Sequence, residues 1–499
     1  MRLIPIRLEP LGRTLELPAG TPLRDALFAY GVEFPCGGRG KCRRCRVRVL
    51  EGDLPPSPGE ERILDPEEIR AGWRLACRAV ATAPVTLEVG QWETTILADE
   101  TEFQFTPREG TGVAVDVGTT TLVAQLLDLK TGHVLGVQTA LNPQAAIGAD
   151  VMSRVEAALA PEGAEKLTGA VRRAVGSLIA SLEPDERLRE IVLVGNTVMH
   201  HLFCAIDVEP LSHYPFRPVR DGLETFRARE LGWELPGDPV AQFLPCLGGF
   251  VGSDLLAGIL AAGMDRRRDP MVLIDLGTNG EIVVAAEGRI LCASTAAGPA
   301  FEGGRISAGM RAATGAIAEA ALSDGRLIVH VIGGGEPRGI CGSGLVDLAA
   351  CGLALGKILP SGRFADGARE WPIAGRVSLL QRDVRELQLA KAAVAAGIRL
   401  LLERLKLETG RVGRLYLAGA FGNYVNRDSA RRIGLIPFDL DRVEPAGNTA
   451  LLGAKLALFR NLPHQRDFNA LRRRVTHVPL ADDPAFQDTY VDSMRFPQG

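Results

Sequence analysis

Four cysteines near the start of the chain have a spacing that could hold an inorganic cofactor. They read Cys-x5-Cys-x2-Cys and then, after a gap of 31 residues, one further cysteine: Cys36, Cys42, Cys45 and Cys77. A disulfide framework is typical of secreted chains, and zinc usually takes two separated Cys-x2-Cys pairs. Three thiolates on one tight loop and a fourth from a distant segment fit a 2Fe–2S cluster better. Zinc binding and a structural role for the thiols are the alternatives.

The sequence around these cysteines indicates a small domain that presents such a loop. Glycine holds three positions between Cys36 and Cys42, and small residues let backbone N–H groups turn toward cluster sulfurs. The flanking pattern predicts a hairpin, a helix and two later strands: Leu3–Leu8, Thr14–Leu17, Thr21–Tyr30, Arg46–Val49 and Val85–Val89. This order resembles the β-grasp fold of 2Fe–2S ferredoxins, and the five-residue gap resembles those of the adrenodoxin kind.

The other five cysteines are scattered in apolar or glycine-rich surroundings. They are Cys204, Cys246, Cys292, Cys341 and Cys351. Isolated cysteines in such surroundings behave as small buried hydrophobic residues. We therefore expect packing from them and no chemistry.

Two segments of the remaining chain repeat one pattern. Val113–Thr120 and Val272–Gly280 each contain three apolar residues, an aspartate, an apolar residue, glycine and threonine, and a second strand-like segment follows. Their aspartates lie 159 positions apart. A strand that runs into glycine comes later in both cases, at Ile191–Asn196 and at Arg414–Gly422. The repetition predicts a duplicated α/β domain.

The chemistry of the two turns suits a polyphosphate. Glycine lets the backbone curl, so that successive N–H groups and threonine hydroxyls can face phosphate oxygens. Asp116 and Asp275 are expected to hold Mg²⁺, usually through water, or to position water near those phosphates. Two such turns that face each other across a cleft would grip a polyphosphate from both sides. The chain has no P-loop, and no convincing dinucleotide-binding glycine motif follows a strand.

The paired turns, together with Leu417–Gly422, resemble the two phosphate motifs and the adenosine motif of the actin, sugar-kinase and heat-shock-chaperone superfamily of ATPases (ASKHA). The resemblance implies ATP with Mg²⁺ as the ligand and Asp116 and Asp275 as the catalytic residues. It also implies that residues of three turns bind the nucleotide: Gly118, Thr119, Thr120, Gly277, Thr278, Asn279, Gly280, Gly419, Ala420 and Gly422.

These motifs divide the chain into domains. We expect a β-grasp 2Fe–2S ferredoxin domain at 1–92, a polar linker at 93–110 and an ASKHA-type ATP-binding domain at 111–499. The ATP-binding domain would consist of two halves, about 111–265 and 266–499. The predicted fold class is α+β followed by duplicated α/β.

Composition excludes several classes of function. The 499 residues are 46% hydrophobic and 23% charged, which is ordinary for a globular protein and rules out disorder as the main state. A net charge of −3 gives no basic field for nucleic acid. The sequence shows neither a signal peptide nor an apolar run long enough to span a bilayer, so we expect a cytoplasmic protein without membrane contact.

The combination of the two parts points to fewer protein families than either part does alone. A Cys-x5-Cys-x2-Cys ferredoxin joined to this ATPase type resembles the reductive activators of corrinoid proteins. Matching strings run along nearly the whole chain: Gly195–His201, Asp275–Glu281, Ala297–Gly303, Ile340–Leu345 and Ala418–Asn423. Some members carry an additional middle domain, and the short linker 93–110 predicts that it is missing here.

The resemblance implies an ATP-dependent electron-transfer enzyme. Electrons from an external low-potential donor would enter at the cysteine cluster and return cob(II)alamin of a methyl-transferring corrinoid protein to cob(I)alamin. A homodimer is compatible with the resemblance. ATP can help only if the nucleotide states bind the oxidised and reduced partner differently, so closure of the two halves would act as a clamp.

Three other functions compete with this interpretation. The first is a small-molecule kinase with a regulatory ferredoxin domain, which would show steady phosphorylation without any corrinoid. The second is an ATP-driven electron donor to another low-potential enzyme. The third is a chaperone-like binding module, which has no use for an iron–sulfur site.

Overall fold

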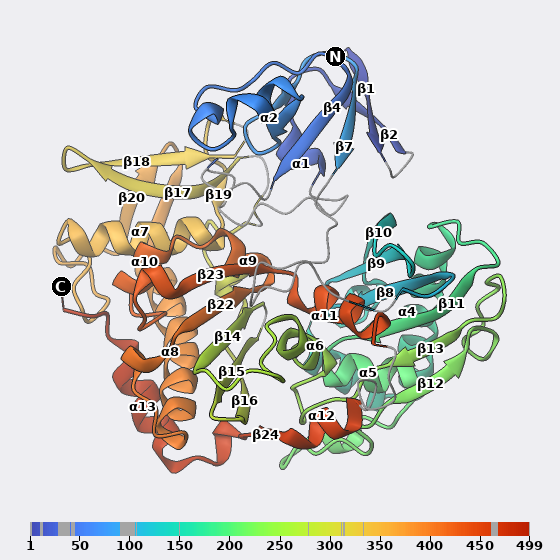
Figure 1. Ribbon diagram of the computed structural model, residues 1–499. Helices are drawn as coiled ribbons and strands as arrows, with labels where there is room; N and C mark the ends of the chain where they lie inside the picture. Colours follow the sequence, from blue (N-terminus) through green and yellow to red (C-terminus); the bar gives the residue numbers. More distant parts are fainter. Residues whose placement is uncertain are drawn as a thin grey trace. The chain divides into compact units, whose positions relative to one another are not determined.

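The computed structural model describes residues 2–9, 13–27, 40, 45–89, 105, 107–148, 150–277, 279–310, 312, 315–332, 334–460 and 468–498 (Figure 1). The chain divides into two compact units. Unit 1 consists of Met1–Arg267 and Asn448–Thr476, and unit 2 of Arg268–Gly447 and His477–Gly499. Each unit is therefore built from segments that lie far apart in the sequence.

The first part of unit 1, blue in Figure 1, is a five-stranded sheet in the order β2-β1-β7-β4-β5. Its elements are β1 (Leu3–Glu9), β2 (Arg13–Pro18), β3 (Thr21–Pro22), α1 (Leu23–Leu27), β4 (Arg46–Gly52), α2 (Pro66–Arg70), β5 (Trp73–Leu75), β6 (Val80–Ala81) and β7 (Val85–Val89). Strands β1 and β7 pair in parallel, and the other neighbours in this sheet pair antiparallel. Ile4, Ile6 and Leu8 are buried because every second residue of β1 faces the same side. The predicted hairpin and later strands are confirmed. The helix is confirmed for Leu23–Leu27, but its predicted start is wrong, because Thr21 and Pro22 form β3 and pair with β6. Tyr30 lies outside the described residues.

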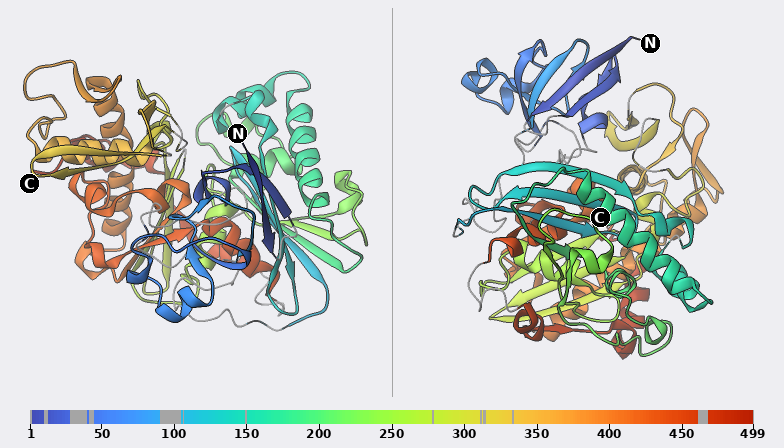
Figure 2. Two further views of the ribbon diagram at one scale, coloured as in Figure 1. Left: turned by 90° about the horizontal axis from the view of Figure 1, so that it is seen from above. Right: turned by 90° about the vertical axis from the view of Figure 1, so that its right-hand side faces the viewer.

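The rest of unit 1 surrounds a six-stranded sheet in the order β10-β9-β8-β11-β13-β12. Its strands are β8 (Thr111–Val117), β9 (Thr121–Asp128), β10 (Val134–Leu141), β11 (Leu188–Val194), β12 (Glu224–Arg227) and β13 (Val240–Phe243). Its helices are α3 (Val151–Leu159), α4 (Gly163–Ala180), α5 (Thr197–Cys204), α6 (Ser253–Ala261), α11 (Thr449–Leu458) and α12 (Phe468–Arg474). Helix α4 lies along one face of this sheet (Figure 2).

The pleat of β8 decides which helices its side chains meet. Its odd-numbered valines lie in the hydrophobic core with α4, whereas Gly112 packs against Leu458 of α11. Since successive strand residues face opposite sides, Asp116 shares the α11 side with Gly112. Helices α6 and α11 cross closely, because a Cβ on Gly453 would lie 2.0 Å from the carbonyl oxygen of Ala257.

Unit 2 contains a second six-stranded sheet, in the order β23-β22-β14-β15-β16-β24. Its strands and those of two small sheets are β14 (Met271–Leu276), β15 (Gly280–Ala286), β16 (Arg289–Thr295), β17 (Ala316–Ser323), β18 (Arg326–Val331), β19 (Gly339–Ile340), β20 (Glu370–Ala374), β21 (Val377–Leu380), β22 (Arg414–Ala418), β23 (Val443–Gly447) and β24 (Val475–His477). Its helices are α7 (Gly342–Ala354), α8 (Gln381–Arg404), α9 (Gly419–Tyr424), α10 (Arg427–Arg432) and α13 (Pro484–Met494). Helices α8 and α13 lie side by side (Figure 1).

Five strands of each six-stranded sheet share one topology, whereas the sixth strand differs: β12 lies beside β13 in unit 1, and β24 lies beside β16 in unit 2. In unit 1, β8, β9 and β10 form an antiparallel meander, and β11 and β13 add to β8 in parallel. In unit 2, β14, β15 and β16 form the same meander, and β22 and β23 add to β14 in parallel. The predicted duplication of an α/β domain is thereby confirmed.

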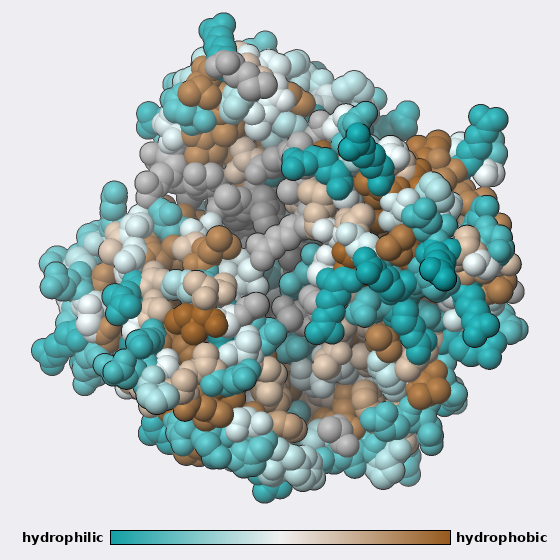
Figure 3. All heavy atoms as spheres, turned by 180° about the vertical axis from the view of Figure 1, so that it is seen from behind, coloured by the Kyte–Doolittle hydropathy of each residue, from teal (hydrophilic) through white to brown (hydrophobic). Residues whose placement is uncertain are grey.

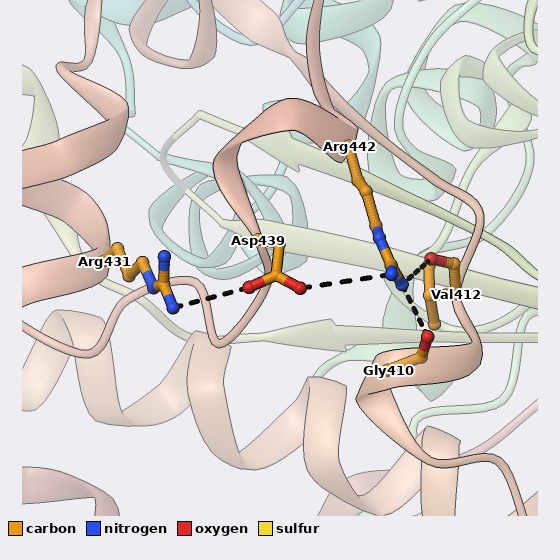
Figure 4. A network of polar contacts seen from close by, with 5 residues as sticks. All are labelled: Gly410, Val412, Arg431, Asp439 and Arg442. Atoms are coloured by element: carbon orange, nitrogen blue, oxygen red, sulfur yellow. Dashed lines mark hydrogen bonds and ion pairs between the residues drawn. The ribbon is translucent and has the colours of Figure 1, made fainter.

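A polar network holds the segments that lead into β22 and β23, at the ends of these strands away from α9 (Figure 4). Arg442 donates to the carbonyl oxygens of Gly410 and Val412 at 2.5 and 2.9 Å. Asp439 lies between Arg431 at 3.4 Å and Arg442 at 4.0 Å. These ion pairs are exposed, so each contributes little to stability.

Hydrophilic and hydrophobic residues are intermixed over the coloured part of the face in Figure 3. None of the helices in the described residues is long and apolar enough to cross a membrane. The five scattered cysteines are all buried, as their surroundings predict, with exposed fractions of 7% or less.

Candidate functional site

Two of the four predicted cluster ligands are neighbours in the structure. Cys45 directly precedes β4, Cys77 follows closely after β5, and these two strands pair antiparallel at this end. The N–H of Ala76 donates to the carbonyl oxygen of Cys45 at 2.9 Å. Cys45 is buried and Cys77 is partly exposed. Cys36 and Cys42 lie outside the described residues.

Gly40, which lies between Cys36 and Cys42 in the sequence, is close to the segment that carries Cys77. Its φ is +63°, and a Cβ there would lie 2.1 Å from Nε of Arg78. Gly40 next to Arg78, and Cys45 next to Ala76, fit the 2Fe–2S cluster that the cysteine spacing predicts. No group of three metal-binding side chains occurs among the described residues, since Cys36 and Cys42 are not among them.

The first predicted phosphate turn joins β8 to β9 in unit 1. Asp116 is the next-to-last residue of β8, and Gly118, Thr119 and Thr120 form the turn. A Cβ on Gly118 would lie 2.5 Å from the carbonyl oxygen of Thr121, so the turn is too tight for any other residue. The three turn residues are partly exposed, which leaves them accessible to a ligand.

Residues from three distant segments meet at this edge of the unit 1 sheet. Asp116 pairs with Val194, so Gly195 at the end of β11 lies beside the first turn. The N–H of Ser253 at the start of α6 donates to the carbonyl oxygen of Gly195 at 2.9 Å, and Asp254 follows. Asp254 was not predicted from the sequence, although a Gly-Ser-Asp triplet at the start of an apolar helix is a typical helix start.

Two carboxyl groups at this edge hold their protons more tightly than usual. Burial raises the pKa of Asp116 to about 6, although Nδ2 of Asn448 donates to its Oδ2 at 2.9 Å and acts in the opposite direction. Burial raises the pKa of Asp254 to about 7, and the charge of Asp116 adds to this effect. Such a pair of carboxyl groups can share a proton or a cation. Asn448 was also missed, and its place directly before α11 was the available signal.

The second predicted aspartate belongs to unit 2. Asp275 pairs with Ala418 across the parallel strands β14 and β22, so Gly419 lies directly beside it. Gly419 has a φ of +76°, and a Cβ there would lie 2.5 Å from Oδ1 of Asp275. The structure therefore brings together Asp275 and the start of α9, two segments that the sequence interpretation assigned to nucleotide binding.

The second turn is closed by its own backbone. The N–H of Gly277 donates to the carbonyl oxygen of Asn279 at 3.1 Å. The carbonyl oxygen of Gly280, the first residue of β15, accepts from the hydroxyl of Thr295 at 3.1 Å. Thr278 lies outside the described residues.

The remaining predicted nucleotide-binding residues lie on α9, which begins at Gly419 and includes Ala420 and Gly422. Between them, Phe421 stacks on Phe301 with ring centroids 4.6 Å apart. Phe301 comes from the Ala297–Gly303 string, so this string packs beside the adenosine motif.

Three family models match the chain. Residues 6–82 match the 2Fe-2S iron-sulfur cluster binding domain, residues 111–267 match the RACo middle region, and residues 269–499 match the C-terminal domain of RACo, the ASKHA domain. The corrinoid activation enzyme RamQ of Eubacterium limosum is 35% identical over 419 residues, which are 77% of this chain and 70% of RamQ. The chain belongs to the family of reductive activators of corrinoid proteins.

Two further relatives agree with membership of this activator family. The [Co(II) methylated amine-specific corrinoid protein] reductase of Methanosarcina barkeri is 26% identical over 428 residues, 77% of either chain. Among solved structures, a "Reductive activator for corrinoid,iron-sulfur protein" matches with a TM-score of 0.68 and 27% identity, over 99% of this chain and 98% of that chain.

The family match corrects one prediction. We expected the middle region of these activators to be missing, but its family model matches residues 111–267. These are the residues that the repeat pattern assigned to the first half of the ATP-binding domain. The prediction was wrong because the middle region itself contains the first sheet and its Asp-x-Gly-Thr turn. These resemble the sheet and turn of the second half, so the region was assigned to the ATP-binding domain.

Proposed function

We propose that this chain carries out the ATP-dependent reductive activation of a corrinoid protein. An inactive cob(II)alamin partner would be returned to cob(I)alamin with electrons from an external low-potential donor. The observation that carries the proposal is the presence, in one chain of the activator family, of a cysteine site and two aspartate turns. The names of RamQ and of the corrinoid protein reductase support it.

Cys36, Cys42, Cys45 and Cys77 are the proposed ligands of a 2Fe–2S cluster. The contact between Ala76 and Cys45 and the fit of Gly40 against Arg78 support a site between the loop and the segment after β5. Such a cluster supplies one-electron transfer when it is bound.

The proposed ATP site uses the three turns that the sequence identified. Asp116 and Asp275 are the proposed catalytic residues and would hold Mg²⁺ through water. Asp254 is added to them, because a carboxyl group with a pKa near 7 suits proton transfer to or from water at neutral pH. The glycines of the turns allow the close backbone approach that phosphate binding needs.

ATP is proposed to change the affinity of this chain for its corrinoid protein partner. A nucleotide can promote an unfavourable reduction only if its bound states interact differently with the oxidised and the reduced partner. We propose that the nucleotide-bound and nucleotide-free states of the ATP-binding domain provide these two affinities.

The test uses the full chain after anaerobic reconstitution with iron and sulfide. Reductant, Mg·ATP and a candidate corrinoid protein are combined, and the absorbance bands of cob(II)alamin and cob(I)alamin are followed. We expect cob(I)alamin to accumulate only with ATP. Equal reduction without nucleotide would contradict the clamp, and steady phosphorylation of a small molecule without a corrinoid would favour the kinase.

A pair of variants separates the two sites. Cys77→Ser should remove the visible absorbance of the iron–sulfur cluster and the reduction of the corrinoid, while ATP hydrolysis continues. Cys246→Ser is the matched control, because Cys246 is buried and is not a predicted ligand. An iron-free wild-type chain after reconstitution would refute the proposed cluster.

A further inference from the structure

The turn between β8 and β9 is held from one side by a buried arginine. We propose that Arg154 is a positioning residue that holds the turn Gly118–Thr120 so that its N–H groups face the phosphates of ATP. The inference rests on the proposed function, because it assumes that this turn binds the nucleotide.

All three carbonyl oxygens of the turn are engaged by two residues. The oxygen of Gly118 accepts from Nδ2 of Asn142 at 2.9 Å, and the oxygen of Thr120 accepts from the backbone N–H of Asn142 at 2.9 Å. The oxygen of Thr119 accepts from Nη2 of Arg154 at 2.6 Å. Asn142 and Arg154 therefore hold the carbonyl groups, which would repel a phosphate.

This arrangement fixes the direction of the N–H groups. In a planar trans peptide the N–H points opposite to the C=O of the same peptide unit. The N–H groups of Thr119 and Thr120 thus point away from Arg154 and Asn142. Neither donates a hydrogen bond within the part of the chain that the structure describes. Two unpaired, adjacent donors on a tight turn are suited to an anion.

Arg154 also forms no ion pair with any described residue. The side chain is fully buried and donates to the oxygens of Gly148 at 2.9 Å and Gln144 at 3.2 Å, and it contacts the sulfur of Met199. No carboxylate in the described residues lies within ion-pair distance of it, and the charge of Asp150 offsets only part of the effect of burial, which lowers the pKa of Arg154. A buried cation without a partner is unfavourable. A bound phosphate would supply the missing negative charge one peptide group away.

The chemistry favours arginine over lysine at this position. A planar guanidinium can reach Thr119, Gly148 and Gln144 at once, and it remains charged at neutral pH even where burial lowers the pKa of Arg154 to about 10. A lysine would keep the charge but make fewer of these bonds. The effect of Arg154→Lys should therefore lie between wild type and Arg154→Met.

The experiment measures binding of Mg·ATP and of AMP to the full chain by isothermal titration calorimetry. AMP lacks the β- and γ-phosphates that the turn is proposed to meet. We expect Arg154→Met to weaken Mg·ATP binding about tenfold or more and to change AMP binding less than twofold, with Arg154→Lys in between. A purely structural role would weaken both nucleotides alike.

Arg172→Met is the matched control in the same unit. Arg172 is half-buried, donates to the carbonyl oxygen of Phe203 at 2.7 Å and is not paired with a carboxylate in the described residues. It should leave both affinities within twofold. Circular dichroism confirms that each variant is folded, and if Arg154→Met does not fold, the ATP-specific loss in Arg154→Lys decides the question.

The outcomes distinguish the two proposals. Unchanged ATP binding in the Arg154 variants, or an equal loss of ATP and AMP, would overturn the role of Arg154 while ATP binding by the wild type stands. A wild-type chain that does not bind Mg·ATP would instead refute the proposed function.

Discussion

The two phosphate turns come from one repeated pattern but are stabilised in different ways. In unit 1, the carbonyls of the turn Gly118–Thr120 accept hydrogen bonds from Asn142 and Arg154, which lie on other elements. In unit 2, the turn is closed by its own Gly277 N–H, and the adjacent aspartate lies against Gly419. The first turn is thus oriented by polar side chains, and the second aspartate is placed by close backbone packing.

The aspartates differ in the same way. Asp116 has an amide partner, Asn448, and an acidic neighbour, Asp254. Asp275 has a glycine against its Oδ1. Duplication has therefore preserved an aspartate near the end of the first strand of each sheet, with a parallel strand beside it. Substitutions in unit 1 should act through charge and protonation, whereas substitutions in unit 2 should act through steric fit.

The largest effect is expected for Gly419→Ala. The Cβ of alanine would lie 2.5 Å from Oδ1 of Asp275. The alanine would also have to adopt a φ of +76°, which residues other than glycine rarely do. Strain and overlap together should lower the free energy of unfolding by about 3 kcal/mol, and displacement of the Asp275 carboxylate should weaken Mg·ATP binding more than any other variant here. Titration calorimetry measures the affinity.

Gly356→Ala is the control for Gly419→Ala. Gly356 has a similar φ of +66°, but a Cβ there would meet nothing within 4 Å. It should lower stability slightly and leave nucleotide binding unchanged. Equal loss of nucleotide binding in both variants would show that backbone conformation, not the approach to Asp275, is what matters in unit 2.

The next effect is expected for Asp254→Asn. Because the pKa of Asp254 is raised to about 7 in the folded chain, the folded state binds more protons than the unfolded state between about pH 4 and pH 7. The contribution of Asp254 to stability is therefore greatest at low pH and is lost as the pH rises through 7. Denaturant unfolding should show that Asp254→Asn gains stability relative to wild type, by on the order of 1–2 kcal/mol, between pH 5 and pH 8.

A pH-independent difference between Asp254→Asn and wild type would contradict the raised pKa of Asp254. ATP hydrolysis should meanwhile fall, since Asp254 is proposed to transfer a proton. The opposite dependence, with the variant losing stability as the pH rises, would show that Asp254 is stabilised as a carboxylate.

A smaller effect is expected for Asn448→Ala. Oδ1 of Asn448 accepts from the N–H of Leu451 and so caps α11, while its Nδ2 donates to Asp116. Loss of the cap should lower the free energy of unfolding by about 1 kcal/mol. Loss of the amide donor should raise the pKa of Asp116 further, which a pH series of Mg·ATP binding would detect.

Asn426→Ala separates the two roles of Asn448. Asn426 caps α10 through the N–H groups of Asp428 and Ser429. It should lower stability to a similar degree without changing the pH dependence of binding. A matching pH shift in both variants would remove Asn448 from the unit 1 site.

The smallest effect is expected for Asp439→Asn, in the network of Figure 4. Its two arginine contacts are exposed and lie at 3.4 and 4.0 Å, so the free energy of unfolding should change by less than about 1 kcal/mol. Chemical denaturation measures this. Nucleotide binding should stay unchanged. A larger loss of stability would show that the segments before β22 and β23 depend on this network.

Much of the fold could be predicted from the sequence because its signals are local. Alternation along Leu3–Leu8, glycine after an aspartate at a strand end, and the repetition of that pattern each depend on neighbouring residues alone. The buried state of the five scattered cysteines followed from their apolar surroundings in the same way.

The sequence by itself was enough to predict the cysteine site, the two aspartate turns and the family, because these predictions depend on residue type and spacing. Only the tertiary structure placed Asp254, Asn448 and Arg154 at the unit 1 turn. They come from the start of α6, the start of α11 and the middle of α3, and no local pattern links them to residue 116. Parallel pairing of β8 with β11 and the close crossing of α6 and α11 bring these segments together, and such long-range packing leaves no periodic trace in the sequence.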